Sequence, residues 1–158
     1  MSAKEMEGQQ KQEITEIRKS IIIDVTPEVV FKAITETNEL TKWFPDHVIL
    51  EPNVGGKVRF SFYKEQNKMD RDYIVEGSII EFIPNKKISY TWQYKDIPEF
   101  PETIVSWKLE ELERDKTRVE LVHSGFTGKE QEKVSSKGHD EGWTHFMNKL
   151  SKYCLQRK

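Results

Sequence analysis

Two of the four histidines in this sequence lie where an imidazole could take part in chemistry. His123 shares one face of a predicted strand with Val119 and Leu121, so we expect its ring to be buried and to need a hydrogen-bonding partner. From there it could donate to a ligand carbonyl or exchange a proton near neutral pH, or backbone groups and water could simply satisfy it. His139 lies four residues before Trp143, close to the apolar side of a predicted helix, and we expect it to be solvated near a cavity mouth.

The other residue types that commonly carry out catalysis are poorly placed for it. The single cysteine, Cys154, lies on the apolar stripe of the last predicted helix, where a buried thiol is a poor nucleophile. The sequence contains no GxSxG or HExxH motif, and His139 and His145 point roughly 240° apart around a helix. Gly55-Gly56 lacks the spacing of a phosphate-binding loop. We therefore predict no metal, no cofactor and no catalytic residue.

Aromatic side chains, at 11% of the residues and including four tryptophans, are the strongest sign of a binding site. Large rings usually mark a deep core or a pocket, because leaving them in water is costly. Either the rings fill the core, or some of them line a cavity, since so many rigid rings pack poorly without gaps. The residues that we predict to line such a cavity are Trp43, Phe44, Phe60, Phe62, Tyr90, Trp92, Trp107, His123, His139, Trp143, Phe146 and Met147.

Composition narrows the class of protein. Lys and Arg number 25 against 27 Asp and Glu, and this near neutrality argues against a nucleic-acid partner. No apolar run is long enough to span a bilayer, so no membrane insertion is predicted, and a single cysteine favours a reducing, cytoplasmic location. The length of 158 residues suits one domain, which we place at 14–158, after a charged, Gln-rich tail at 1–13 that we expect to be disordered.

The elements that would position these residues begin with a predicted strand over 14–25. The Thr-Pro-Glu sequence at 26–28 has the pattern of a helix start, with Thr26 as the N-cap. Asn38 is predicted to cap a second short helix, which Pro45 ends. In the long last helix, apolar residues recur at i, i+3, i+4, i+7, i+10 and i+11, namely at Trp143, Phe146, Met147, Leu150, Tyr153 and Cys154.

Five or six antiparallel strands are expected between the short helices and the last one. Apolar alternation gives bounds for five of them, at 58–62, 73–83, 88–94, 104–112 and 117–123. Gly77 indicates a bulge or bend in its strand. Gly142 would cost the last helix about 1 kcal/mol relative to Ala, unless it lets another backbone approach closely. We therefore predict an α+β fold in which a curved antiparallel sheet wraps around the C-terminal helix, with a cavity in the trough that one helix cannot fill.

An ordered set of segments gives the chain a family resemblance from about Ile14 to Tyr153. The segments are Thr26–Phe31, Leu40–Phe44, Gly55-Gly56, Gly77–Pro84, Ile88–Trp92, His123–Phe126 and Gly142–Leu150. The set resembles the single-domain proteins related to the C-terminal domain of the Hsp90 ATPase activator (the AHSA1-like family), within the START-like, Bet v 1-like or SRPBCC, superfamily. The resemblance implies a helix-grip fold with a hydrophobic cavity under the last helix. It does not fix the activity, because the superfamily includes lipid carriers, polyketide cyclases, hormone receptors and co-chaperones.

We expect a non-enzymatic cytoplasmic protein that binds a small apolar or aromatic molecule between the sheet and the last helix. One alternative, which rests on the resemblance alone, is a co-chaperone-like partner of an Hsp90-type ATPase. The other is an enzyme of the polyketide cyclase or dehydratase kind, with His123 as acid or base and Tyr90 orienting a carbonyl. This enzyme hypothesis requires both side chains in the same pocket.

Overall fold

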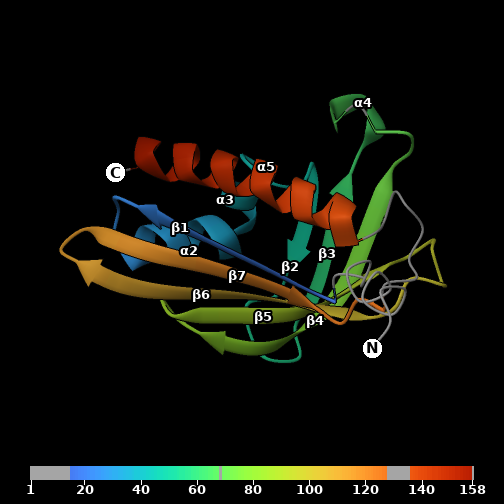
Figure 1. The fold of residues 1–158 in the computed structure, drawn as a ribbon, viewed down its shortest axis with the longest axis horizontal. Coiled ribbons are helices and arrows are strands. Elements are labelled where there is room, and N and C mark those ends of the chain that lie inside the picture. The colour runs from blue at the N-terminus through green and yellow to red at the C-terminus, as the bar shows by residue number, and fades with distance from the viewer. Residues whose placement is uncertain (1–14, 68, 128–135, 158) are drawn as a thin grey trace, which may run out of the picture.

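The computed structural model describes residues 15–67, 69–127 and 136–157. The tail predicted to be disordered, residues 1–13, lies outside the described residues. Within them the chain forms one curved antiparallel sheet and four helices, with the long last helix crossing one side of the sheet (Figure 1). The elements in chain order are β1 Glu16–Ile23, α2 Pro27–Thr35, α3 Thr37–Leu40, β2 His47–Leu50, β3 Lys57–Phe62, α4 Lys64–Asn67, β4 Tyr73–Ile83, β5 Lys87–Tyr94, β6 Thr103–Glu113, β7 Lys116–Ser124 and α5 Ser136–Gln156.

The sheet has seven strands in the order β1-β7-β6-β5-β4-β3-β2, and all six neighbouring pairs are antiparallel. The register aligns Tyr90 of β5 with Val105 of β6, and Val105 with His123 of β7. Since directly opposed residues share a face, these three side chains point to the same side of the sheet, towards the core. The predicted α+β helix-grip architecture, with two short helices after the first strand, is confirmed.

The sheet changes register along β4, where the sequence suggests an irregularity at Gly77. A side chain at Gly77 would overlap the backbone carbonyl of Thr91 on the neighbouring strand β5. The Ser78 N–H donates to Thr91 Oγ1 at 2.9 Å, and the register shifts between Ile79 and Glu81. A shift of this kind bends a strand and raises its local twist, which helps the sheet to curl.

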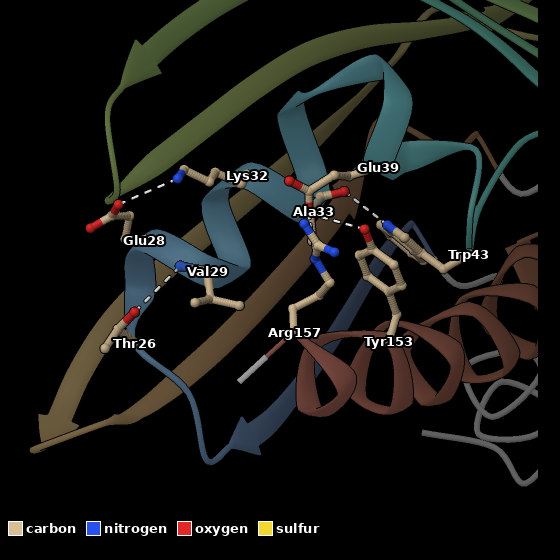
Figure 2. Close-up of polar contacts among 9 residues, drawn as sticks. All are labelled: Thr26, Glu28, Val29, Lys32, Ala33, Glu39, Trp43, Tyr153 and Arg157. Atoms are coloured by element: carbon tan, nitrogen blue, oxygen red, sulfur yellow. Dashed lines mark hydrogen bonds and ion pairs between the residues drawn. The ribbon is translucent and has the colours of Figure 1, made fainter.

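The starts of the two short helices agree with the sequence in one case and differ in the other. The Val29 N–H donates to Thr26 Oγ1 at 3.4 Å and Pro27 opens the helix, so the predicted cap of α2 is confirmed (Figure 2). The prediction that Asn38 caps α3 is wrong. The extended backbone of Glu36 ends α2 and begins α3 directly, so Asn38 lies inside that helix.

Two short elements lie where the sequence suggested only connections. β2 places His47 at the edge of the sheet and pairs with β3, with Val48 opposite Phe60. α4 is a single turn within the polar connection before β4. Elements of four residues carry too little periodicity to stand out from a connection.

Helix α5 is held differently along its length. Figure 1 shows α2 and α3 beneath its C-terminal half, where Leu150 and Cys154 are fully buried. Close by, the Tyr153 hydroxyl donates to Glu39 Oε1 at 3.1 Å, and Arg157 Nε lies 4.0 Å from the same oxygen (Figure 2). No described helix combines the length and the apolar sequence that crossing a bilayer would need.

Candidate ligand-binding cavity

A cavity of about 480 Å³ lies between the sheet and the N-terminal half of α5. Its volume falls within the range of about 300–1,000 Å³ that is usual for small-molecule sites. The wall is built by strands β3, β4 and β5, by helix α5, and by the chain just after α3 and just before β4. The lining residues are Phe44, Phe62, Met69, Asp70, Tyr73, Trp92, Tyr94, Gly138, His139, Glu141, Gly142, Trp143 and Phe146.

Half of the residues that we predicted from the sequence to line a cavity do line this one. They are Phe44, Phe62, Trp92, His139, Trp143 and Phe146. Phe44 is central to the group, because its ring centroid lies 4.9–5.4 Å from those of Phe60, Phe62, Trp143 and Phe146. These rings touch one another and the cavity, so that the wall is continuous with the core. Ligand binding by them stays a prediction.

The other nominated residues pack in the core behind the cavity. They are Trp43, Phe60, Tyr90, Trp107, His123 and Met147, all of them buried. Trp43 and Trp107 meet edge to face at 6.0 Å, and the Phe60 and Tyr90 rings lie 5.5 Å apart. For these positions the structure shows filling of the core and no surface facing the cavity.

Sequence reasoning missed several wall residues, and a usable signal existed for two of them. Tyr94 follows Trp92 at period two on β5, and Tyr73 precedes Val75 in the same way on β4, so both belong to the inward face. Met69 and Asp70 precede β4 in a segment without periodicity, where no pattern indicates that the chain folds back over the sheet.

His123 is a structural histidine whose ring nitrogens are both engaged. The Thr103 hydroxyl donates to the Trp92 carbonyl at 2.8 Å, so its oxygen is left to accept from His123 Nε2–H, also at 2.8 Å. His123 Nδ1 accepts from the Trp143 indole N–H at 3.0 Å. Burial, and then the neighbouring His139, hold the pKa of His123 well below its usual value. The imidazole is therefore neutral and fixed in the Nε2–H tautomer.

The enzyme hypothesis needs His123 and Tyr90 in one pocket, and the structure does not bring them there. Both point to the same side of the sheet, but neither lines the cavity. The Tyr90 hydroxyl accepts from the Trp107 indole N–H at 3.0 Å, and burial raises the pKa of this tyrosine. Both side chains therefore form hydrogen bonds inside the core.

His139 is buried in the cavity wall, and the expectation that it is solvated is wrong. Its exposed fraction is 9%, and its Nε2 lies 2.7 Å from the Tyr94 hydroxyl. The ring of Phe100 stacks on it at 5.6 Å, and Phe126 approaches from another side at 5.2 Å. The rings from the loop after β5 and the chain after β7 cover a position that helix periodicity alone places near the surface.

Polar groups of the wall belong to tyrosines and carboxylates. The Tyr73 hydroxyl donates to Asp70 Oδ1 at 2.7 Å, and burial followed by this hydrogen bond and the charge of Asp70 raises the pKa of Tyr73 to about 12. Burial also raises the pKa of Tyr94. Both phenols therefore stay protonated at neutral pH. Asp70 and Glu141 are acidic, and none of the described lining residues is Lys or Arg.

Gly142 leaves free space at the cavity. A Cβ at this position would meet no other heavy atom within 4 Å, apart from its chain neighbours and the helix backbone. The close backbone approach that the sequence suggested is therefore not found. Gly142 instead lines the cavity, one turn of α5 away from His139 and Phe146.

A seven-stranded curved antiparallel sheet closed by a C-terminal helix defines a protein of the helix-grip, SRPBCC-type class. Within that class, the family model for Activator of Hsp90 ATPase homolog 1-like protein matches residues 24–154, and the chain belongs to this family. No curated protein matches the sequence significantly.

Solved structures share the fold at low sequence identity. MLL2253 from Mesorhizobium loti is 23% identical, with a TM-score of 0.74 over 90% of this chain and 98% of that one. PFC0360w, an HSP90 activator from Plasmodium falciparum, is 20% identical, with a TM-score of 0.68 over 87% and 94%. DynU16, a protein of the dynemicin biosynthetic locus, is 19% identical, with a TM-score of 0.73 over 92% of this chain; the chain spans 49% of DynU16, about half its length.

Proposed function

We propose that this protein binds a small, uncharged, ring-containing molecule between the sheet and α5, and releases it unchanged. The cavity of about 480 Å³ with walls made mainly of aromatic rings is the observation that supports the proposal. A flat apolar guest would gain ring contacts, and the apolar area that it removes from water favours binding by about 25 cal/mol per Å². The buried, unpaired Cys154 thiol is consistent with a reducing cytoplasm as the place where it works.

The charges of the wall support an uncharged guest. Asp70 and Glu141 line the cavity, and the described lining residues include no Lys or Arg that could pair with a guest carboxylate or phosphate. Moving such an anion from water into the cavity would cost hydration without a compensating ion pair. We therefore expect 2-naphthol to bind at least about tenfold more tightly than 2-naphthoate at pH 7.5, a difference of ~1.4 kcal/mol.

Binding without chemical transformation is supported by the two groups that an acid–base mechanism would use. His123 and Tyr90 lie outside the cavity and are engaged in hydrogen bonds with Trp143 and Trp107. The acidic residues of the wall are a carboxylate that accepts from Tyr73 and the exposed Glu141. This arrangement favours holding a guest over exchanging protons with it.

Replacing Gly142 with a large residue would fill part of the cavity and so tests the proposal. The fluorescence of 1-aminoanthracene, an uncharged three-ring probe, rises in apolar surroundings and reports binding. We expect saturable binding to the wild type with one probe per chain. Gly142→Phe, which extends a ring into the free space, should weaken binding at least about tenfold (~1.4 kcal/mol).

Gly142→Ala is the matched control, because it changes the backbone preference of the same helix position while adding only one methyl group. Its affinity should stay within about twofold of the wild type (~0.4 kcal/mol). Absence of saturable binding to the wild type, or equal affinity of the Phe and Ala variants, would count against a guest in this cavity.

A second candidate, action on an Hsp90-type ATPase, is favoured by family membership and by the likeness to the Plasmodium falciparum HSP90 activator. The steady-state ATPase rate of the cognate chaperone, measured with and without this protein, tests it. Stimulation that saturates with added protein supports it. An unchanged rate at a several-fold excess of this protein rejects it.

A further inference from the structure

The four tryptophans are all buried, and their indole N–H groups separate one of them from the rest. Three indoles donate to buried acceptors: Trp43 to the Ala33 carbonyl at 2.8 Å, Trp107 to the Tyr90 hydroxyl at 3.0 Å, and Trp143 to His123 Nδ1 at 3.0 Å. Trp92 is equally buried, at 3% exposure, but its Nε1–H has no hydrogen-bond partner among the described residues. It is also a residue of the cavity wall.

An unpaired buried donor is costly, because it has given up its hydrogen bond to water without gaining another. The usual penalty is about 1–3 kcal/mol, and native proteins keep few such groups. Because Trp92 Nε1 is covered by the surrounding protein atoms, it is not exposed to solvent that could relieve this penalty. The three other indoles, including that of Trp143 in the same wall, show that this core does provide acceptors for indole N–H groups.

Tyr94 is a neighbour of this donor in the cavity wall. Its hydroxyl lies 2.7 Å from His139 Nε2, and its ring meets that of Trp92 edge to face at 6.3 Å. Burial raises the pKa of Tyr94, and the Trp92 indole N–H opposes that rise. Tyr94 is half-buried at the last position of β5 and also lines the cavity.

We propose that the guest of this cavity carries an uncharged hydrogen-bond acceptor, such as a ketone oxygen, which the Trp92 indole N–H binds after Tyr94 turns aside. The inference rests on the proposed function and adds to it one recognition atom and one chemical group of the guest. The group is a carbonyl or similar acceptor in place of a carboxylate, since Asp70 and Glu141 would repel a negative charge.

A matched pair of probes isolates the carbonyl. 1-Tetralone and tetralin share a bicyclic skeleton and differ by a C=O in place of a CH₂, and displacement of 1-aminoanthracene gives the affinity of each. Their different solubility in water affects every protein variant equally, so the informative quantity is the ratio of the two affinities compared between variants. We expect Trp92→Phe, which keeps a ring but removes the N–H, to lower the preference for tetralone about fivefold to tenfold.

Trp107→Phe is the matched control, since Trp107 donates to Tyr90 and does not line the cavity. It should lower stability and leave the tetralone preference as in the wild type. The same preference in Trp92→Phe as in the wild type would overturn the inference and leave the carrier function standing. If neither probe nor 1-aminoanthracene binds the wild type, the carrier function fails and the inference falls with it.

A measurement on the wild type alone covers the case in which Trp92→Phe does not fold. The ¹H–¹⁵N spectrum contains four indole N–H signals, one for each tryptophan. Tetralone should move one of them strongly downfield, as a new hydrogen bond does, whereas tetralin should not. If all four signals respond alike to the two probes, Trp92 does not recognise the carbonyl, and the inference is overturned.

Discussion

The two halves of helix α5 belong to one element but are surrounded very differently. The C-terminal half buries Leu150 and Cys154 completely against the core above α2 and α3. Its Tyr153 and Arg157 reach the buried carboxylate of Glu39. This half excludes water and fixes the position of the helix.

The N-terminal half of α5 borders the cavity. Asp140 forms an ion pair with Lys19 of β1 at 2.8 Å, and His139 meets the hydroxyl of Tyr94. A partly exposed ion pair of this kind contributes about 0–1 kcal/mol. Gly142 in the middle of this half leaves space where a side chain would otherwise reach. If the proposed function holds, stability and binding depend on opposite halves of the same helix.

The largest effect is expected from Leu150→Ala, which removes a buried side chain from the C-terminal half of α5. Leu150 is fully buried, so its truncation leaves a void and should lower the free energy of unfolding by about 2–5 kcal/mol. Urea denaturation followed by tryptophan fluorescence measures this loss. Phe146→Ala is the counterpart at the cavity, where the half-buried ring should cost less stability but weaken 1-aminoanthracene binding more. If both variants lost stability and affinity in the same proportion, the two halves would not be distinct.

A smaller effect, on pH dependence, tests whether the C-terminal half excludes water. Burial, and then the charge of Glu39, raises the pKa of the Cys154 thiol from 9.0 to about 12. Between these values the unfolded thiol ionises while the folded one keeps its proton. The contribution of the Cys154 thiol to the free energy of unfolding is therefore complete below about pH 9. It is lost as the pH rises towards 12, by up to about 1.4 kcal/mol per pH unit.

Cys154→Ala removes this titration, and comparison of the two slopes isolates it. Urea denaturation at pH 8, 9, 10 and 11 should show a shallower decline for the variant, by roughly the same 1.4 kcal/mol per pH unit. The variant is also expected to be less stable at every pH because of the lost packing, so only the slope is informative. Parallel declines in both proteins would mean that water reaches the thiol.

The smallest effect is expected from Gly142→Ala, which tests whether the N-terminal half of α5 has free space at this position. The added methyl group meets no neighbour, and Ala favours a helix interior over Gly by about 0.5–1 kcal/mol. The melting temperature should therefore rise slightly. A fall would show that the position is more crowded than the structure indicates.

The sequence predicts the helices and strands of this fold better than it predicts which side chains face the cavity and which fill the core. The 3.6-residue spacing of Trp143, Met147 and Leu150 defines α5. Period-two alternation likewise defines the long strands, because both patterns arise within one element. The sequence could not separate Phe44, which faces the cavity, from Trp43, which fills the core, because the difference depends on how α2 and α3 fill one end of the trough.

The hydrogen bonding of the site was beyond reach of the sequence for a related reason. Nothing near His123 in the chain indicates that Thr103 and Trp143 would engage both of its nitrogens. The same holds for the unpaired N–H of Trp92, since a missing partner is a property of the whole packed arrangement. Such features are visible only when residues far apart in the chain, here twenty positions apart, are placed together.

The contact of Gly77 with Thr91 has a consequence for how the protein can diversify. Substitutions among the wall rings alter which shapes fit, but the tilt of β4 relative to β5 is set where a hydrogen atom alone fits against a carbonyl. A methyl group at Gly77 would push β4 and β5 apart. Because these strands carry Tyr73, Trp92 and Tyr94, this part of the cavity wall would be displaced as a whole. The shape of the cavity thus depends on a residue that does not line it.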